Sequence, residues 1–460
     1  MPEKSSERSL PSSTQNPQPG LRRSLKLWHL IVYGIIIIQP TAPMGIYGVV
    51  SNEAGGHVVT TILIAMVAML FTAFSYGRMA RVYPSAGSAY TYVGKELNPL
   101  LGYVVGWSML MDYLLNPIIC VIWCSAAAQN VVPGIPYAAW AVAFAFLFTV
   151  LNLRGVKTSG RMNGILALGM SIVVVIFLAE SVRYIALVLR PMVGQWLVPF
   201  YDPATFTPLR VMRGTSIAVL TYIGFDGIST MSEEVENPRR NILLATVATC
   251  LVIGILSAVE VYVAQLIWPA HTPFPESMVD TAYVFVAKRV GGNFLFQLLN
   301  GTLLIATIGS GMAAQFGAAR LLYGMGRANA LPSRVFAAID ARTGIPRNNV
   351  LVVGACALLG AFLLTYQSGA ELLNFGAFIA FMGVNAAALV HYKFRSAEKV
   401  FLPAAMPFLG FVVSAFIWLN LNHKAQLLGT VWILVGIALY YIMRRIGAEP
   451  DKLLEIDEPL

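Results

Sequence analysis

Five carboxylic acids interrupt long apolar stretches of this chain, and ionisable groups at such positions are expensive unless they are paired, protonated or hydrated. They are Asp112, Glu180, Asp226, Glu260 and Glu371. Buried carboxylates of this kind carry protons or meet cations. Asp226, Glu260 and Asp112 are the candidates for proton coupling. Glu180 and Glu371 are nearer the ends of predicted helices, where water reaches them more easily.

Asp226 stands in the stretch TYIGFDGIST, residues 221–230, between two glycines. Glycines tolerate backbone angles that break a helix, and the freed backbone donors solvate a carboxylate at the break. Asp226 is therefore predicted to meet a cationic ligand, to carry a proton, or to cap the second half of a broken helix.

A second group of polar residues lies in the segment 102–117. Tyr113 offers a ring for cation–π contact together with a hydroxyl group, and Asn116 follows about one helical turn later. Adjacent helical residues point about 100° apart, so Asp112 and Tyr113 are not expected to serve one ligand equally. We predict that Tyr113 and Asn116 contact a substrate, whereas Asp112 has either a substrate or proton role or a contact between helices.

The composition requires that these residues sit in a membrane protein. Of 460 residues, 57% are hydrophobic and 12% are charged, and the mean hydropathy is +0.69. Apolar runs of about 20 residues recur along the chain, each long enough to cross a bilayer as a helix. We predict an all-α polytopic protein with twelve transmembrane helices, near 28–51, 58–77, 99–129, 136–153, 161–189, 211–231, 242–268, 293–319, 349–366, 370–391, 403–421 and 425–443.

The net charge of +9 follows the membrane topology and does not indicate nucleic-acid binding. With the N-terminus in the cytoplasm, 24 of the 31 Lys and Arg residues fall on the inside, which predicts that both termini are cytoplasmic. The membrane is expected to be a bacterial-type inner (cytoplasmic) membrane. Residues 1–24 and 446–460 are expected to be cytoplasmic tails, the first of them disordered, around a single transporter-like domain spanning 25–445.

Two predicted helices interrupt themselves. The first contains Pro40, Thr41, Pro43 and Gly45, and the sixth contains the Gly224–Gly227 break. Because they are five helices apart, they occupy corresponding positions of two repeats, and an odd number of spans inverts the second copy. This arrangement is typical of transporters that bind substrate at broken helices near the bilayer midplane; the alternative is a pair of ordinary kinks.

Other kinds of chemistry find no support in the sequence. The five histidines lack metal-ligand spacing, and Cys120 and Cys124 are interpreted as small packing residues. No nucleophile–base pair indicates an enzyme, no filter-like repeat indicates a channel, and no cofactor or metal site is predicted.

The chain resembles the amino acid–polyamine–organocation superfamily of secondary transporters over almost its entire length. The resemblance rests on YIGFDGISTMSEEVENPRRNI (222–242), FSYGRMARVYPSAGSAYTYV (74–93) and ARLLYGMGRANALP (319–332). The stretch GYVVGWSMLMDYLLNP (102–117) is most similar to the bacterial putrescine importers.

The resemblance implies the fold of the sodium-coupled leucine transporter, with two inverted five-helix repeats (about 28–189 and 211–391) and two further helices (403–443). It implies substrate contacts from the first break, at Pro40, Thr41 and Gly45, and from the sixth, at Ile223, Gly224 and Phe225, with Phe225 either an aromatic gate or a packing residue. In the putrescine-importer branch, the position of Tyr113 holds a substrate-contacting tyrosine.

The sequence departs from the family at two points, and these departures leave the identity of the substrate undecided. The glycine-rich motif that cradles an amino acid carboxylate is replaced here by residues 39–45, and the acidic residue that putrescine importers carry near Gly45 is absent. We therefore expect a proton-coupled symporter or exchanger for an amino acid or a small organic amine. The alternative is a membrane sensor of the same fold that binds its ligand without moving it.

Overall fold

The computed structural model describes residues 25–84, 88–154, 160–232, 235–268, 272–327, 331–340, 343–395 and 401–445. Both predicted tails, 1–24 and 446–460, lie outside these residues. The described chain is helical and contains no β-strand; its one isolated bridge joins Leu25 to Val235.

The first predicted helix is broken into two. α1 (Leu27–Ile38) and α2 (Ala42–Glu53) are bent by 46° at a junction of three residues. Pro40 in the junction and Pro43 in the first turn of α2 have no N–H to donate, so a continuous helix would lack two of its hydrogen bonds here. The predicted break is therefore present.

Seven helices are long and apolar enough to cross a membrane: α3 (Val58–Val82), α5 (Pro99–Val131), α7 (Gly160–Tyr184, continued by a π-turn Ile185–Leu189), α9 (Pro238–Ile267), α11 (Ala282–Arg327), α14 (Tyr366–Val390, continued by a π-turn His391–Arg395) and α16 (His423–Arg445). The bent α1–α2 pair makes an eighth candidate. Three shorter apolar helices accompany them: α6 (Tyr137–Leu153), α13 (Arg347–Leu363) and α15 (Phe401–Leu419).

The sixth predicted span, 211–231, is broken more severely than the first. It consists of α8 (Pro208–Ala218), a 3₁₀ turn (Val219–Tyr222), two non-helical residues and a second 3₁₀ turn (Phe225–Met231). The remaining short elements are α4 (Ser88–Glu96), α10 (Glu276–Val279), α12 (Ser333–Phe336) and a 3₁₀ turn (Val193–Trp196).

Two sequence predictions need correction. Residues 293–319 are only part of α11, whose first turns bend at Gly291 and Gly292, and Gly292 takes a positive φ of 65°. α4 was not among the predicted helices; Ala89, Tyr92 and Val93 are buried, so packing supports it.

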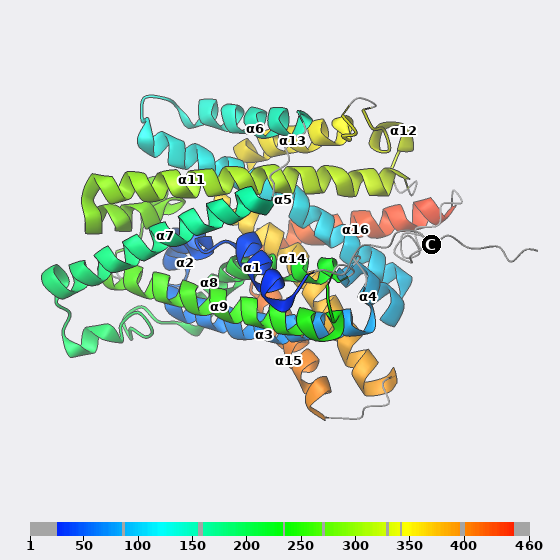
Figure 1. Ribbon diagram of the computed structural model, residues 1–460, viewed down its shortest axis with the longest axis horizontal. Coiled ribbons are helices and arrows are strands. Elements are labelled where there is room, and N and C mark those ends of the chain that lie inside the picture. Colours follow the sequence, from blue (N-terminus) through cyan, green and yellow to red (C-terminus); the bar gives the residue numbers. More distant parts are fainter. Residues whose placement is uncertain are drawn as a thin grey trace, which may run out of the picture.

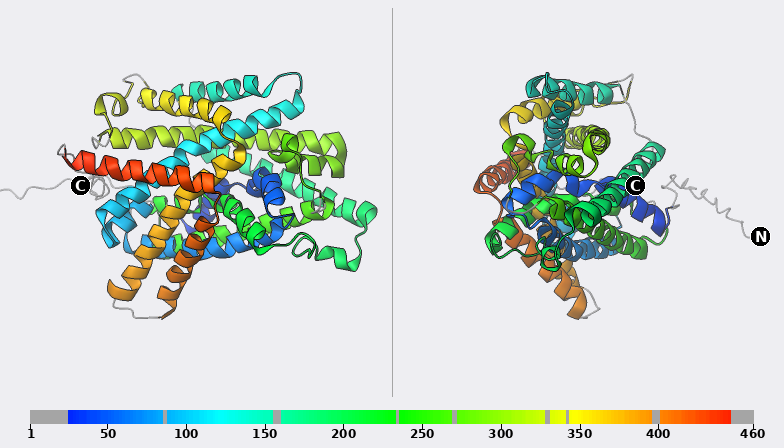
Figure 2. Two further views of the ribbon diagram at one scale, coloured as in Figure 1. Left: turned by 180° about the vertical axis from the view of Figure 1, so that it is seen from behind. Right: turned by 90° about the vertical axis from the view of Figure 1, so that its left-hand side faces the viewer.

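Most of the long helices run roughly along the long axis of the molecule, whereas α15 is steeply inclined to it; α6 and α13 lie at one edge and α15 at the opposite edge (Figures 1 and 2). α3 packs along α9, while α5 packs against both α11 and α14 and so crosses the centre. α4 and α12 lie at the same end of the bundle (Figure 1). This end is called the α4 end.

The outer face is apolar. On α7, for example, Leu168 and Val175 each expose 63% of their surface. Large apolar side chains exposed along whole helices match a lipid environment, because lipid tails are as apolar as the side chains themselves.

Candidate functional site

The two helix breaks touch each other. Gly224 has a φ of 117°, a conformation that glycine adopts without strain. A Cβ atom at Gly224 would lie 2.7 Å from Cγ2 of Ile37, in the last turn of α1. The absence of a side chain at Gly224 therefore allows the break in the sixth span to pack directly on the end of α1.

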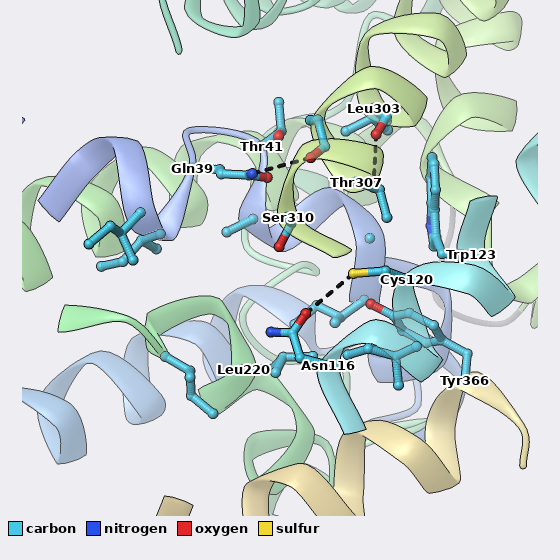
Figure 3. Close-up of a pocket in the computed structure, with 18 residues that line it drawn as sticks. Gln39, Thr41, Asn116, Cys120, Trp123, Leu220, Leu303, Thr307, Ser310 and Tyr366 are labelled. Carbon is cyan, nitrogen blue, oxygen red and sulfur yellow. Dashed lines mark hydrogen bonds between the residues drawn. The ribbon is translucent and has the colours of Figure 1, made fainter. Parts of the chain in front are cut away.

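A cavity of about 150 Å³ opens beside these breaks. If a water molecule occupies roughly 30 Å³, the space suits about five waters or one small molecule. Side chains from five regions, the α1–α2 junction, α5, the 3₁₀ turn before Gly224, α11 and α14, surround it (Figure 3). The lining residues are Ile37, Ile38, Gln39, Thr41, Ala42, Gly45, Ile46, Asn116, Ile119, Cys120, Trp123, Leu220, Ile223, Leu303, Ala306, Thr307, Ser310 and Tyr366.

None of these lining residues carries a charge. Several of their polar groups already have partners in the protein. The Gln39 amide donates to the carbonyl of Ala306 (3.5 Å), and the Thr307 hydroxyl donates to the carbonyl of Leu303 (2.8 Å), as Figure 3 shows. The cavity therefore offers hydrogen bonds but no counter-ion for a buried charge.

Trp123 of α5 differs from these residues. Its indole Nε1 is shielded from solvent and has no hydrogen-bond partner among the described residues. A Cβ atom added to Gly45 would lie 3.9 Å from that nitrogen and 3.4 Å from the hydroxyl of Tyr366. The bare backbone at Gly45 thus leaves room next to both polar groups.

Four of the predicted substrate contacts line this cavity: Thr41, Gly45, Asn116 and Ile223. Pro40 is buried in the α1–α2 junction without lining it, and Gly224 packs on Ile37 as described.

Tyr113 and Phe225 also lie outside the lining. Tyr113 is 39% exposed, and its ring contacts α11 at Gly317, where an added Cβ would lie 3.0 Å from its Cε1. Phe225 is fully buried, with its ring centroid 5.5 Å from those of both Tyr76 and Phe381.

Asp226 and Asp112 are half-buried and do not line the cavity. A carboxylate oxygen of Asp226 accepts a hydrogen bond from the Gly224 N–H (3.3 Å), so the break supplies the backbone donor expected from the sequence. Asp112 is close enough to Asp226 for the two charges to repel each other. Each lies three or four residues from a lining residue, Asp112 from Asn116 and Asp226 from Ile223.

Glu260 of α9 is completely buried, and neither carboxylate oxygen has a hydrogen-bond partner in the described part of the chain. Burying a charged carboxylate in such surroundings would cost several kcal/mol, so the surroundings of Glu260 suit the neutral acid. The other two carboxylates have partners: Glu180 pairs with Arg183 at 2.7 Å, and Glu371 accepts from the amide of Gln367 at 2.9 Å.

Sequence reasoning missed much of the lining. Cys120, interpreted as a packing residue, and Trp123 both line the cavity. Asn116, Cys120 and Trp123 follow an i, i+4, i+7 spacing, which places them on one face of α5. That spacing was the sequence signal that could have identified Cys120 and Trp123 as lining residues together with Asn116. Ser310 and Tyr366 come from segments far away in the sequence, with no local pattern to mark them.

The amino acid permease family model matches residues 29–452, nearly the whole chain. The chain belongs to the amino acid permease family. It is accordingly an integral membrane transporter and not an enzyme, and the predicted resemblance is confirmed. Among the residues described, no group of histidine, cysteine or acidic side chains is arranged to hold a metal ion.

Several characterised relatives are similar over most of their length. The low-affinity putrescine importer PlaP of Escherichia coli (strain K12) is 32% identical over 427 residues, covering 91% of this chain and 92% of PlaP. The methylthioribose transporter of Bacillus subtilis is 25% identical over 461 residues (94% and 96%). The branched-chain amino acid permease BcaP of Lactococcus lactis is 26% identical over 441 residues (89% and 92%).

Proposed function

We propose that this permease is a proton-coupled secondary transporter that moves an amino acid or a small organic amine across the cytoplasmic membrane by alternating access. The observation that carries the proposal is the position of the cavity, which is lined both by the α1–α2 break and by Ile223 of the sixth-span break. Broken helices that line an internal cavity are the usual substrate sites of inverted-repeat transporters.

The topology we propose has twelve membrane crossings. The eight long or bent candidates, the three shorter apolar helices and the broken segment 208–231 supply them. We assign the first ten to two inverted repeats, about 28–189 and 211–391, and, on the basis of the positive-inside bias, we assign the α4 end to the cytoplasm.

In this proposal Thr41, Gly45, Asn116 and Ile223 contact the substrate directly, since they line the cavity. Pro40 and Gly224 shape the two breaks. Tyr113 lies about one turn from Asn116 on the side of the α4 end, and Phe225 and Asp226 follow Gly224 in the same direction. We place these three side chains on the path between the cavity and the cytoplasm.

For coupling, we propose that Asp226, Glu260 and Asp112 exchange protons during transport. Asp226 and Asp112 repel each other when both are charged, and the Glu260 carboxylate has no hydrogen-bond partner among the described residues that would stabilise its charge. Each group thus has a physical reason to bind a proton in one state of the cycle.

Reconstituted protein tests the proposal. Liposomes are loaded at one pH and diluted into a lower pH, and uptake of labelled putrescine, methylthioribose, leucine and other amino acids is measured. The proposal predicts saturable uptake of at least one compound that accelerates with an inward proton gradient. If a compound binds and none is taken up, the sensor alternative applies.

Three substitutions then test the coupling residues: Asp226→Asn, Glu260→Gln and Asp112→Asn. The variant that removes the coupling proton should still exchange labelled for unlabelled substrate but should lose acceleration by the gradient. Glu180→Gln is the matched control, because Glu180 is part of an exposed pair with Arg183. If all three variants respond to the gradient like the wild type, another group carries the proton.

A further inference from the structure

The indole N–H of Trp123 is a buried donor that nothing in the described chain satisfies. Trp123 is only 3% exposed, and its indole nitrogen is shielded from bulk solvent. Leaving a buried donor unpaired is unfavourable, and such groups in native proteins call for an explanation. Because Trp123 lines the cavity next to Gly45, a molecule bound in the cavity can supply the hydrogen-bond acceptor.

Two polar groups that line the same cavity do not act as the acceptor. The Asn116 side-chain oxygen accepts from the Cys120 thiol (3.3 Å), and the hydroxyl of Thr41 is directed to Met170 Sδ (3.6 Å). Neither group is bonded to the indole nitrogen. A molecule in the cavity would satisfy the donor if it carried a carboxylate, carbonyl or hydroxyl oxygen.

A diamine does not meet this requirement. Protonated amines donate hydrogen bonds and accept none, so a diamine would leave the Trp123 N–H unpaired. It would also bring two positive charges into a cavity whose lining holds no carboxylate, and burying unpaired charge is costly. An amino acid has no net charge from its backbone groups and carries two acceptor oxygens.

We propose that Trp123 is a specificity-determining residue whose indole N–H donates to the carboxylate of the substrate beside Gly45, and that this permease takes amino acids in preference to the corresponding amines. The proposal rests on the transport function proposed above and deepens it. It assigns to α5 a recognition role that does not depend on the backbone of the two helix breaks.

The test combines one protein change with one ligand change. Trp123→Phe keeps an aromatic ring but removes the N–H. The ligands are three pairs that differ only in the carboxylate: ornithine and putrescine, lysine and cadaverine, leucine and 3-methylbutylamine. Affinities are measured by ligand-dependent thermal shift of the purified protein, and each pair gives a ratio of amine to amino acid dissociation constants.

Trp140→Phe is the matched control. The Nε1 of Trp140 in α6 is also buried and has no hydrogen-bond partner within the described ranges, but Trp140 does not line the cavity. Comparing the two variants separates loss of a ligand contact from the general effect of replacing an indole. The melting temperature without ligand shows whether either variant is folded.

In the wild type, at least one amino acid should bind more tightly than its amine. A hydrogen bond to a charged group contributes about 1.5–3 kcal/mol, so Trp123→Phe should reduce that preference by about tenfold or more. The amine affinities should stay within about twofold, and Trp140→Phe should change neither ligand class.

Two results would overturn the inference. One is a wild-type protein that binds every amine more tightly than its amino acid. The other is a folded Trp123→Phe protein that keeps the wild-type preference or loses it only as far as Trp140→Phe does. Failure of the transport proposal looks different: the amino acid binds in a Trp123-dependent way, but liposomes accumulate none of it.

Discussion

Gly224 packs directly against Ile37 where the two helix breaks meet: a Cβ atom on Gly224 would come within 2.7 Å of Ile37 Cγ2. The contact joins the end of α1 to the second break at a point where both border the cavity. It also explains why the glycine at this position matters both for its backbone angle and for its lack of a side chain.

Gly224→Ala should therefore damage the protein in two ways. A left-handed backbone costs about 1–2 kcal/mol for a residue with a Cβ, and the steric contact with Ile37 adds to that. We expect a lower melting temperature in detergent and little or no uptake in liposomes.

Gly227→Ala is the control for this prediction. Gly227 belongs to the same break, but a Cβ there would meet only Ile37 Cδ1, at an ordinary 3.4 Å. The Gly227→Ala protein should stay closer to the wild type in both melting temperature and liposome uptake. Equal effects of the two substitutions would mean that the Gly224–Ile37 contact has no special role.

Phe225→Ala tests the aromatic cluster beyond the break. Phe225 is stacked on Phe381 and meets Tyr76 edge to face, with no exposed surface. Truncating a buried phenylalanine typically costs about 3–5 kcal/mol, so the melting temperature should fall clearly, while Phe225→Leu should recover part of the loss. Phe408→Ala, at a 53% exposed position of α15, should have little effect. A tolerated Phe225→Ala protein would show that this packing is dispensable.

The sequence predicted the features that depend on local chemistry. Pro40 and Pro43 cannot donate the hydrogen bonds of a helix, so the first break followed from residue type alone. Gly224 likewise marked the second break. Asn116 was predicted as a substrate contact about one helical turn from Tyr113, and it lines the cavity.

The rest of the site depends on tertiary packing. Tyr366 and Ser310 reach the cavity only because α14 and α11 both pack against α5. Phe225 and Asp226 neighbour Gly224 in sequence, yet they lie outside the lining, since the 3₁₀ turn that follows Gly224 directs Phe225 toward Phe381. No local sequence pattern predicts either of these two arrangements.

Glu96→Gln tests a buried ionic cluster at the α4 end. The Glu96 carboxylate, with no exposed surface, lies 2.6 Å from Nδ1 of His391 and 3.1 Å from a guanidinium nitrogen of Arg395, and it accepts from the hydroxyl of Tyr83 (2.8 Å). The cluster ties α4 to the end of α14. Because Arg395 is half exposed, we expect the amide to cost about 1–2 kcal/mol, less than a fully buried pair would.

Glu180→Gln provides the comparison for Glu96→Gln. The Glu180–Arg183 pair is exposed, and exposed pairs contribute about 0–1 kcal/mol. The melting temperature should therefore fall more for Glu96→Gln than for Glu180→Gln. The opposite order would exclude a stabilising role for the cluster.

Asp280, in the connection between α10 and α11, should make the stability of the protein depend on pH. Burial raises the pKa of its carboxyl group from 3.8 to about 6. The folded protein then binds the proton more tightly than the unfolded chain, so stability falls as the pH rises from about 4 to about 6 and stays lower above that range. The pKa difference corresponds to at most about 3 kcal/mol.

Asp280→Asn removes this dependence, because the amide is neutral at every pH. Thermal unfolding of both proteins in detergent between pH 4 and pH 7.5 measures the effect. The melting temperature of Asp280→Asn relative to the wild type should rise as the pH rises from 4 to 6, and the difference between the two proteins should be constant above that range. Glu276→Gln, an exposed neighbour in α10, should follow the wild-type profile. If the Asp280→Asn and wild-type melting temperatures run parallel over the whole range, burial of Asp280 does not affect stability in the way its surroundings imply.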